Sequence, residues 1–466
     1  MFLNLDKHKQ DKLAIKDDSG YSLTYKDVCD TVGAFHDLAL ERCVVFCLCE
    51  SCAGSLVGYL AFENNRQVPL LLSASLDSGL RDNLESIYQP SYYWAPERKA
   101  EELGGEVIYS AYGYVLIKTG YEPYELNEQL SMLLTTSGST GSPKLVRHKY
   151  GNLEANAENV AKVFGWREEE KGICDLPMNY TMGLNVINSH LFAGASVLMV
   201  KANLMDPDFW SFIKENGGTS FCGVPFSYEI MRRIGFDKME LPDLYTLAEG
   251  GGKLTDKMFK WTADYCKRTG KRFCATFGTS ETSARMAFLD PALATEKIGS
   301  IGKAIPNGEL FLIDEAQSDD GCVTGELGYR GPNVTMGYAV CREDLLKGDE
   351  FCGEYHTGDI AKRDSDGFYY IIGRKGRFLK LFGLRVSLDE TERILKAKYP
   401  LADCVCTGDD KRMNIFTVDG SLKDEIIPFI SGKTNLHNSA FRVCVVEKIP
   451  RNDYGKVKFA ELESMI

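Results

Sequence analysis

The stretch Leu133–His148 reads LLTTSGSTGSPKLVRH, and it sets the interpretation of the rest of the chain. An apolar approach leads into a run of small and hydroxylated residues that ends with Pro143 and Lys144. Closely spaced small residues let backbone N–H groups and hydroxyls turn towards one centre, and the lysine adds a cation. The stretch therefore predicts a loop that binds phosphate.

This loop differs from a Walker loop, because the pattern G-x-x-x-x-G-K-[ST] occurs nowhere in the chain. A flexible Gly/Ser linker is the other interpretation, but apolar residues flank the run and Pro-Lys closes it. Phosphate binding is favoured, and the candidate residues are Thr136, Ser137, Gly138, Ser139, Thr140, Gly141 and Lys144.

The bulk composition is that of a globular protein with more than one domain. The 466 residues exceed one ordinary core, and 44% are hydrophobic while 26% are charged. A formal net charge of −12 argues against a nucleic-acid surface. The start of the chain shows no apolar targeting segment, and no apolar run could span a bilayer. We expect a cytoplasmic protein without membrane insertion.

Four of the fifteen cysteines lie within ten residues and raise the question of a metal site: Cys43, Cys47, Cys49 and Cys52. A closed zinc site usually has two pairs of close ligands separated by a loop, and no second pair follows at a suitable distance. The run RCVVFCLCE instead reads as a buried strand, where cysteine behaves as a small apolar residue. We therefore expect neither a metal nor disulfides at this cluster.

Strand-length apolar runs alternate with amphipathic stretches over most of the sequence, which favours an α/β fold with largely parallel strands. After about residue 310, short strands joined by Gly-Asp and Asp-Gly turns indicate antiparallel hairpins. The last ninety residues contain a helix, SLDETERILKAKY, with a Ser cap, and further strands. We predict an N-terminal domain over 1–374 and a small α+β domain over 375–466.

The Leu133–Lys144 run resembles the signature loop of the adenylate-forming superfamily, which includes acyl- and aryl-CoA synthetases, nonribosomal-peptide adenylation domains and beetle luciferases. The superfamily's other motifs follow in order along nearly the whole chain. The resemblance implies an enzyme that uses ATP and Mg²⁺ to convert a carboxylic acid to an acyl-adenylate, and then passes the acyl group to a thiol. It also implies a large N-terminal domain of several subdomains and a small mobile C-terminal domain.

The run Phe277–Glu281, FGTSE, resembles the superfamily's aromatic-Gly-x-Thr-Glu element. By that match Ser280 contacts the α-phosphate and Glu281 helps to hold Mg²⁺, and both count as catalytic candidates. An aromatic residue at the start of the run would lie near the adenine, here as Phe where Tyr is commoner. The remaining nucleotide-binding candidates are Phe277 and Gly278 of this run, and Gly250 and Gly251 of the glycine-rich segment EGGGK upstream.

The TGD motif of the superfamily matches YHTGD at Tyr355–Asp359, so Asp359 is implied to accept hydrogen bonds from both ribose hydroxyls. Arg374, which opens the hinge motif, would reach the ribose or a phosphate. We interpret the segment around Gly325–Leu327 and the pair Gly337–Tyr338 as mainly structural.

The hinge motif itself places the pivot on Gly376, where the superfamily usually has Asp or Lys. Glycine takes up large φ/ψ changes without steric penalty, so this departure suits a hinge. Gly383 and Arg385 complete the motif and are assigned to the face that serves thiol transfer. Near the end, PRNDYGKV resembles the element that carries the catalytic lysine, here Lys456, a mobile cation that offsets transition-state charge.

The acid is less well specified than the nucleotide. By superfamily position the acyl pocket is lined near Asn179, Tyr180, Val224 and Thr279. No Asp stands where amino-acid-activating relatives pair the substrate ammonium, which disfavours an α-amino acid and leaves fatty, short-chain and aryl acids open. His148 and His190 are interpreted as packing or hydrogen-bonding residues rather than catalysts.

Three functions stay open, with CoA as the favoured acceptor. Within the same chemistry, the acceptor is alternatively the phosphopantetheine thiol of an acyl or peptidyl carrier protein. A catalytically silent nucleotide-binding protein on this fold is the third, and the presence of Lys144, Glu281, Asp359 and Lys456 argues against it.

Overall fold

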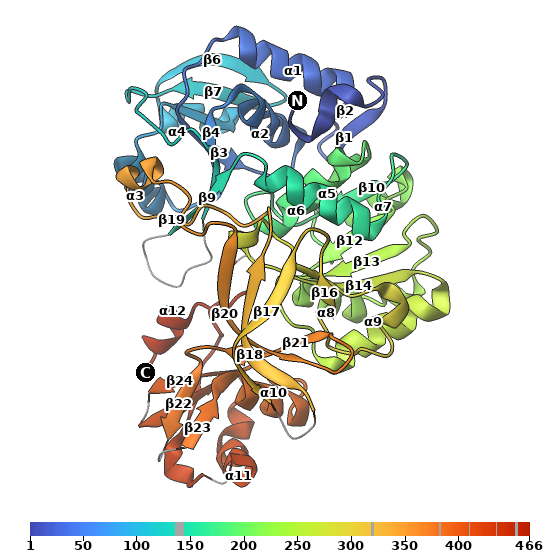
Figure 1. Cartoon of the computed structure of the whole chain (residues 1–466), viewed down its shortest axis with the longest axis vertical. Coiled ribbons are helices and arrows are strands. Elements are labelled where there is room, and N and C mark those ends of the chain that lie inside the picture. The colour runs from blue at the N-terminus through green and yellow to red at the C-terminus, as the bar shows by residue number, and fades with distance from the viewer. Residues whose placement is uncertain (136–143, 318–320, 382–383, 410, 435, 453–454) are drawn as a thin grey trace. The chain divides into compact units, whose positions relative to one another are not determined.

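The computed structural model describes residues 1–135, 144–317, 321–381, 384–409, 411–434, 436–452 and 455–466. They form two compact units (Figure 1). Unit 1 comprises the described residues of 1–310 and 329–355, and unit 2 those of 311–328 and 356–466. The predicted boundary at residue 374, between the large domain and the mobile small domain, stays a prediction.

One sheet of unit 1 has eight strands and is parallel at its centre and antiparallel towards both edges. The central strand β3 is buried at every position, as the RCVVFCLC run predicts for a strand covered on both faces. In sheet order the strands are β19 (Tyr338–Ala339), β9 (Leu145–Lys149), β8 (Leu130–Thr135), β4 (Val68–Ser73), β3 (Val44–Cys49), β5 (Tyr92–Pro96), β7 (Tyr114–Lys118) and β6 (Glu106–Ala111).

The second sheet of unit 1 has nine strands, of which the six central ones are parallel. Crossover helices connect these strands, which confirms the predicted α/β class. In sheet order the strands are β16 (Lys303–Ala304), β15 (Ala287–Phe288), β14 (Arg272–Phe277), β13 (Thr246–Glu249), β12 (Ser220–Gly223), β10 (Lys171–Cys174), β11 (Ser196–Met199), β1 (Leu13–Asp17) and β2 (Ser22–Thr24).

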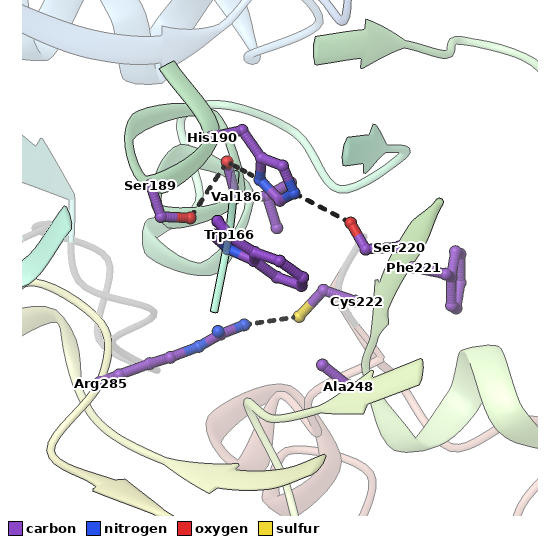
Figure 2. Close-up of a pocket in the computed structure, with 9 residues that line it drawn as sticks. All are labelled: Trp166, Val186, Ser189, His190, Ser220, Phe221, Cys222, Ala248 and Arg285. Atoms are coloured by element: carbon purple, nitrogen blue, oxygen red, sulfur yellow. Dashed lines mark hydrogen bonds between the residues drawn. The ribbon is translucent and has the colours of Figure 1, made fainter. Parts of the chain in front are cut away.

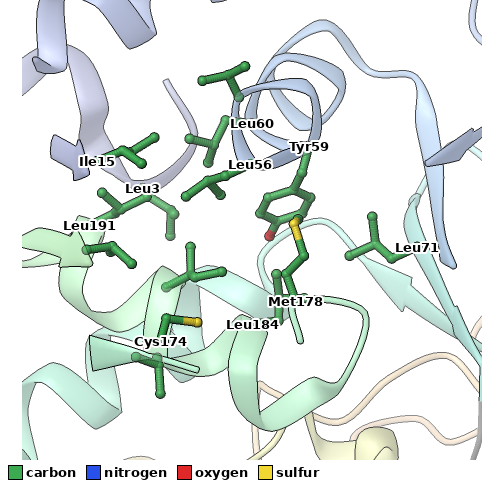
Figure 3. Close-up of a cluster of buried hydrophobic side chains, with 14 of the residues drawn as sticks. Leu3, Ile15, Leu56, Tyr59, Leu60, Leu71, Cys174, Met178, Leu184 and Leu191 are labelled. Atoms are coloured by element: carbon green, nitrogen blue, oxygen red, sulfur yellow. The ribbon is translucent and has the colours of Figure 1, made fainter. Parts of the chain in front are cut away.

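Two helices of unit 1 are enclosed on nearly every side. In α2 the residues from Ala53 to Glu63 are buried, and in α6 those from Thr181 to Leu191 are buried. One hydrophobic cluster joins them to strands of both sheets (Figure 3). The helices of unit 1 are α1 (Tyr25–Asp37), α2 (Ala53–Asn65), α3 (Ser78–Tyr88), α4 (Ala100–Leu103), α5 (Asn152–Phe164), α6 (Thr181–Phe192), α7 (Pro207–Asn216), α8 (Pro225–Arg233) and α9 (Asp256–Thr269).

Unit 2 contains short, mostly antiparallel sheets, as the Asp-Gly and Gly-Asp turns predict. Ser387 caps α10 by accepting the N–H of Glu390 at 3.1 Å, which confirms the predicted helix start. Three of its strands have one end in unit 1: β17 (Glu309–Gln317), β18 (Val323–Arg330) and β20 (Glu354–Arg363). The other elements are β21 (Tyr369–Arg374), β22 (Phe378–Leu381), β23 (Leu384–Ser387), α10 (Leu388–Lys398), β24 (Cys404–Asp409), β25 (Arg412–Thr417), α11 (Lys423–Thr434), β26 (Phe441–Val445) and α12 (Phe459–Glu463).

The clustered cysteines are part of the core. Cys43, Cys47 and Cys49 are buried in and beside β3, and burial raises the pKa of each thiol. Among the described residues, no group of His, Cys, Asp and Glu has the arrangement of a metal site. The burial of β3 at every position confirms the interpretation of this run as a buried strand. Within the same described ranges, no helix combines the length and apolar character that a bilayer crossing needs.

Candidate active site

The predicted α-phosphate contact lies on a single 3₁₀ turn, η4 (Ser280–Thr282), directly after β14. Gly278 precedes it, and a Cβ there would lie 1.5 Å from the carbonyl oxygen of Ala284, so a side chain does not fit. The Ser280 hydroxyl lies 2.7 Å from Thr181 Oγ1, which ties the turn to the first residue of α6. The sequence reasoning did not single out Thr181.

Glu281, the predicted metal ligand, is held by a tyrosine from β19. The Tyr338 hydroxyl donates to Glu281 Oε1 at 2.8 Å, and burial with the nearby carboxylate raises the Tyr338 pKa far above its usual range. Tyr338 is therefore a neutral hydrogen-bond donor to Glu281 at every physiological pH. Lys144 Nζ lies 3.5 Å from the centroid of the Tyr338 ring, a cation–π contact.

These contacts bring Lys144 and Glu281 together through Tyr338, a residue that the sequence reasoning had interpreted as structural. Among the described contacts of the Glu281 carboxylate, only Oε1 is hydrogen-bonded, and a carboxylate has a second oxygen for a hard cation. The residues present therefore fit a Mg²⁺ ion carried with a nucleotide.

Two predicted nucleotide contacts, Gly250 and Gly251, follow β13 directly, and side chains of the α6 region approach both closely. A Cβ on Gly250 would lie 1.9 Å from Met182 Cε, and one on Gly251 would lie 2.2 Å from the Tyr180 hydroxyl. The four acyl-pocket candidates stand at element starts: Asn179 is buried before α6, Tyr180 caps α6, Val224 caps α8, and Thr279 caps η4.

Phe277 closes β14 and is half-buried. Phe277, the predicted adenine contact, thus lies at the same strand end as Ser280 and Glu281. Carboxyl ends of parallel strands are where ligands bind in open α/β sheets.

Unit 2 brings its own two ribose candidates together. Asp359 in β20 is 3% exposed, and Arg374 at the end of β21 donates from Nε to its Oδ1 at 2.8 Å. Two residues on, Gly376 has a φ of +96°, which residues with a side chain rarely adopt. This conformation accounts for glycine at the predicted pivot, while the pivoting itself stays a prediction.

Lys456 is exposed in unit 2 and precedes Val457, which forms a β-bridge with Arg451. Its backbone N–H donates to Asn452 Oδ1 at 2.9 Å. Arg385 lies in β23, with its side chain outside the described part. The other predicted residues that lie outside the described residues are Thr136, Ser137, Gly138, Ser139, Thr140, Gly141 and Gly383.

Both histidines that the sequence raised as possible catalysts are buried and neutral. Burial lowers the pKa of His148 to about 3 and that of His190 to about 4. His190 donates from Nδ1 to the Val186 carbonyl at 2.8 Å, and its Nε2 lies 2.9 Å from Ser220 Oγ. His148 Nδ1 lies 3.3 Å from Ser283 Oγ. These contacts agree with packing and hydrogen bonding rather than acid–base chemistry.

The model of the AMP-binding enzyme family matches residues 78–339, more than half of the chain. The chain belongs to this family. The match includes the signature loop, α6, the Phe277–Glu281 turn and Tyr338, so all of the unit 1 site lies within it. The predicted superfamily is thereby confirmed.

Curated relatives and solved structures agree with this family. The chain is 27% identical over 354 residues to 2-succinylbenzoate–CoA ligase of Bacillus cereus, covering 74% of this chain and 72% of that protein. The AMP complex of O-succinylbenzoate coenzyme A synthetase from Bacillus subtilis is 19% identical, covers 99% of this chain and 97% of that one, and has a TM-score of 0.77. ATP-bound MatB from Rhodopseudomonas palustris is 20% identical, with 100% and 99% covered and a TM-score of 0.75. The predicted fold and the predicted class of acid–thiol ligase are confirmed.

Proposed function

We propose that this protein activates a small carboxylic acid with ATP, releases pyrophosphate, and transfers the acyl group from the adenylate to CoA. The observation that carries the proposal is the grouping of Ser280, Glu281 and Lys144 within unit 1 of an AMP-binding enzyme. A hydroxyl and a carboxylate on one turn, with a lysine linked to the carboxylate through Tyr338, suit a triphosphate whose metal neutralises the like charges.

Each residue has a role that follows from its contacts. Glu281, fixed by Tyr338, would hold Mg²⁺, which when bound offsets phosphate charge and so favours attack on the α-phosphorus. Ser280, fixed by Thr181, would donate to the α-phosphate. Lys144 would exchange its contact with the Tyr338 ring for a phosphate oxygen, because an ammonium binds an anion more strongly than an aromatic face.

The ribose residues of unit 2 complete the proposal. Asp359 would accept hydrogen bonds from both ribose hydroxyls, and Arg374, already bonded to it, would hold its carboxylate in orientation. We propose that the segment from 375 onward turns about Gly376 between the two half-reactions. Lys456 would take part in adenylation in one orientation and leave in the other.

CoA is the proposed acceptor because the curated relatives are named as CoA ligases. The same names make 2-succinylbenzoate the first acid to test. We place the reaction in the cytoplasm, where ATP and CoA are available.

Pyrophosphate exchange across a library of carboxylic acids tests the activation step. CoA and a holo-carrier protein are then offered separately to the adenylate. Loading of the carrier, with CoA leaving the adenylate intact, would replace the proposed acceptor. Tight ATP binding without exchange for any acid would make the protein a silent nucleotide binder instead.

Lys456→Ala separates the two half-reactions. We expect it to lower adenylation by at least about a hundredfold, since one positioned transition-state donor contributes that much. Thioester formation from pre-made acyl-adenylate should stay within about twofold of the unmodified enzyme, because the lysine has left by then. Equal loss in both assays would contradict the turning of the C-terminal segment.

A further inference from the structure

The turn that carries Ser280 and Glu281 continues into a backbone conformation that is unfavourable for its residues. Ser283 has a φ of +55° and Ala284 a φ of +103°, and both residues are buried. Residues with a side chain rarely adopt these left-handed values, and they keep them only where the surrounding structure holds them. The turn therefore depends on contacts from elsewhere in unit 1.

A single buried asparagine bridges this turn. Asn333 is 0% exposed, and its Nδ2 donates to the carbonyl oxygens of Thr282 at 2.7 Å and Arg285 at 3.1 Å, one on each side of the left-handed pair. Its own carbonyl oxygen accepts a hydrogen bond from the Ser283 hydroxyl at 3.0 Å. The Tyr329 hydroxyl donates to Asn333 Oδ1 at 2.8 Å, which orients the amide so that Nδ2 points at the two carbonyls.

The chain over residues 333–338 also reaches both halves of the proposed ATP site. The N–H of Thr335 donates to the Glu281 carbonyl at 2.9 Å, and the Tyr338 hydroxyl donates to the Glu281 carboxylate. On the other side β19 pairs with β9, which begins directly after Lys144. This short segment thus joins the turn after β14, in one sheet, to the strand that leaves the predicted phosphate loop, in the other.

The two ends of the bridged turn differ in how much they depend on Asn333. The carbonyl of Arg285 also accepts from Asn156 Nδ2 at 2.9 Å, and the Arg285 guanidinium donates to Cys222 Sγ at 2.9 Å beside a small cavity (Figure 2). The carbonyl of Thr282, by contrast, accepts only from Asn333 within the described residues. Loss of the Asn333 amide would therefore release the η4 side of the turn first.

We propose that Asn333 is a positioning residue for the activation of the acid, which holds the turn so that Ser280 and Glu281 keep their placement relative to Lys144. The inference rests on the proposed function. Asn333 does not act on the nucleotide itself, because both donors of its amide and its Oδ1 are engaged with the protein. Its effect passes through the two side chains on the turn, where a displacement of about 1 Å is enough to lower a rate about a hundredfold.

The first measurement is pyrophosphate exchange per folded protein, with folding checked by circular dichroism. Asn333→Ser removes both amide donors and keeps a small polar group. We expect it to lower kcat at least about tenfold and to leave KM for the acid within about threefold, because the displaced groups act on the phosphates. Asn188→Ser is the matched control, since Asn188 is also buried and donates to the hydroxyl of a buried tyrosine, Tyr59, at 3.0 Å. It should leave kcat within about twofold.

A second measurement needs no turnover. Binding of α,β-methylene-ATP, which cannot release pyrophosphate, is followed by calorimetry with Mg²⁺ and again with EDTA. The gain in affinity that Mg²⁺ provides should shrink at least about fivefold in Asn333→Ser, since the support of the proposed metal ligand Glu281 is lost. It should change by less than about twofold in Asn188→Ser.

Ala284→Gly tests the cause of the effect. Glycine adopts a φ of +103° without a steric penalty, so the turn would need less support from Asn333. By itself this substitution should leave kcat within about twofold, and added to Asn333→Ser it should raise kcat at least about threefold over that variant. Should Asn333→Ser fail to fold, Tyr329→Phe takes its place. It removes only the hydroxyl that orients the amide, and it should lower kcat about threefold.

The outcomes separate this inference from the proposed function. If kcat or the Mg²⁺-dependent gain in affinity stays within about twofold of the unmodified enzyme in Asn333→Ser, the positioning role is overturned. It is also overturned if Ala284→Gly restores none of the lost rate. If the unmodified enzyme exchanges pyrophosphate with no acid, the proposed function fails, and the binding measurement, which needs no acid, still decides whether Asn333 supports the metal site.

Discussion

Arg147 and Arg285 are both buried in unit 1, and the comparison of their surroundings separates a well-compensated charge from a poorly compensated one. Arg147 in β9 donates to the carbonyls of Lys347 and Met336 at 2.6 and 3.1 Å and to Glu350 Oε2 at 2.5 Å. Arg285 has two sulfurs and an aromatic ring. In both, Nε is without a partner among the described residues, so the contrast lies at the outer nitrogens.

Oxygen partners fix Arg147 in place and join β9 to the segment after β19. Such an arginine contributes to folding because its removal would break three hydrogen bonds from a charged donor, although the Met336 carbonyl would keep the Glu350 N–H as a donor. Arg285 contributes little of this kind, since its sulfur partners lose little when it is replaced. The comparison therefore predicts that replacement by methionine lowers the free energy of unfolding much more at Arg147 than at Arg285.

The largest effect is expected for Arg147→Met, which should lower the free energy of unfolding by about 3 kcal/mol, because three hydrogen bonds from a buried charged donor are lost. Urea denaturation followed by circular dichroism measures this. Glu350→Gln is the control and should cost about 1 kcal/mol or less, because Glu350 is half-exposed and its pairing is screened by water. Equal effects from both variants would show that the carbonyl contacts contribute nothing.

The histidine that follows Arg147 makes stability depend on pH. Burial lowers the pKa of His148 from 6.5 to about 3, so below pH 6.5 the unfolded chain binds a proton that the folded chain refuses. Stability is therefore lost as pH falls, by about 2–3 kcal/mol between pH 6.5 and 4.5 from this residue. The measurement is the difference between the unmodified protein and His148→Gln at each pH, because other groups titrate in the same range. A difference that is constant with pH contradicts the assignment.

A smaller effect is expected for Arg285→Met, within about 1 kcal/mol of the unmodified protein, because an apolar side chain of similar size replaces a poorly compensated charge. A double-mutant cycle with Glu249→Gln sharpens the result. The two substitutions should be additive within about 0.5 kcal/mol if the Glu249 carboxyl, whose pKa burial raises well above its usual range, is protonated. Coupling above about 2 kcal/mol would show that Arg285 and Glu249 form a structural ion pair. Arg147 and Arg285 would then both be well-compensated charges.

The smallest effect concerns the pKa of His190, which lines the same small cavity as Arg285. The positive charge of Arg285 contributes to lowering the His190 pKa, after burial, whereas no such influence acts on His148. In Arg285→Met the imidazole of His190 should titrate at a higher pH, and that of His148 should not move. Histidine ring NMR signals over pH 3 to 6 report both. An unchanged His190 pKa would show that the Arg285 guanidinium lies farther from this imidazole than described.

Much of the fold and part of the site follow from local sequence. The strands and helices are recognisable because apolar runs of strand length alternate with helices, and the Ser cap of α10 sits where the pattern puts it. Asp359 and Arg374 come together because their strands pair in register. Ser280 and Glu281 are found because their motif is a short contiguous run.

The contacts that join distant segments were not predictable. Thr181 reaches Ser280 across 99 positions and Tyr338 reaches Glu281 across 57, and no local period links such residues. Arg285 stands in the run ARMAFL, where a charge between apolar residues is the one hint of burial. Its neighbours come from α5, α6 and β12, so their meeting depends on how the sheet packs.

The enclosure of α6 has a consequence for how this scaffold changes its substrates over evolution. A helix surrounded from Thr181 to Leu191 cannot shift its axis to admit a longer or bulkier acid without disturbing both sheets. Selectivity must then drift by exchange of individual side chains along that helix, with the main chain conserved in place. Met182, an adaptable thioether between Gly250 and Arg285, is the position where such an exchange would first change selectivity.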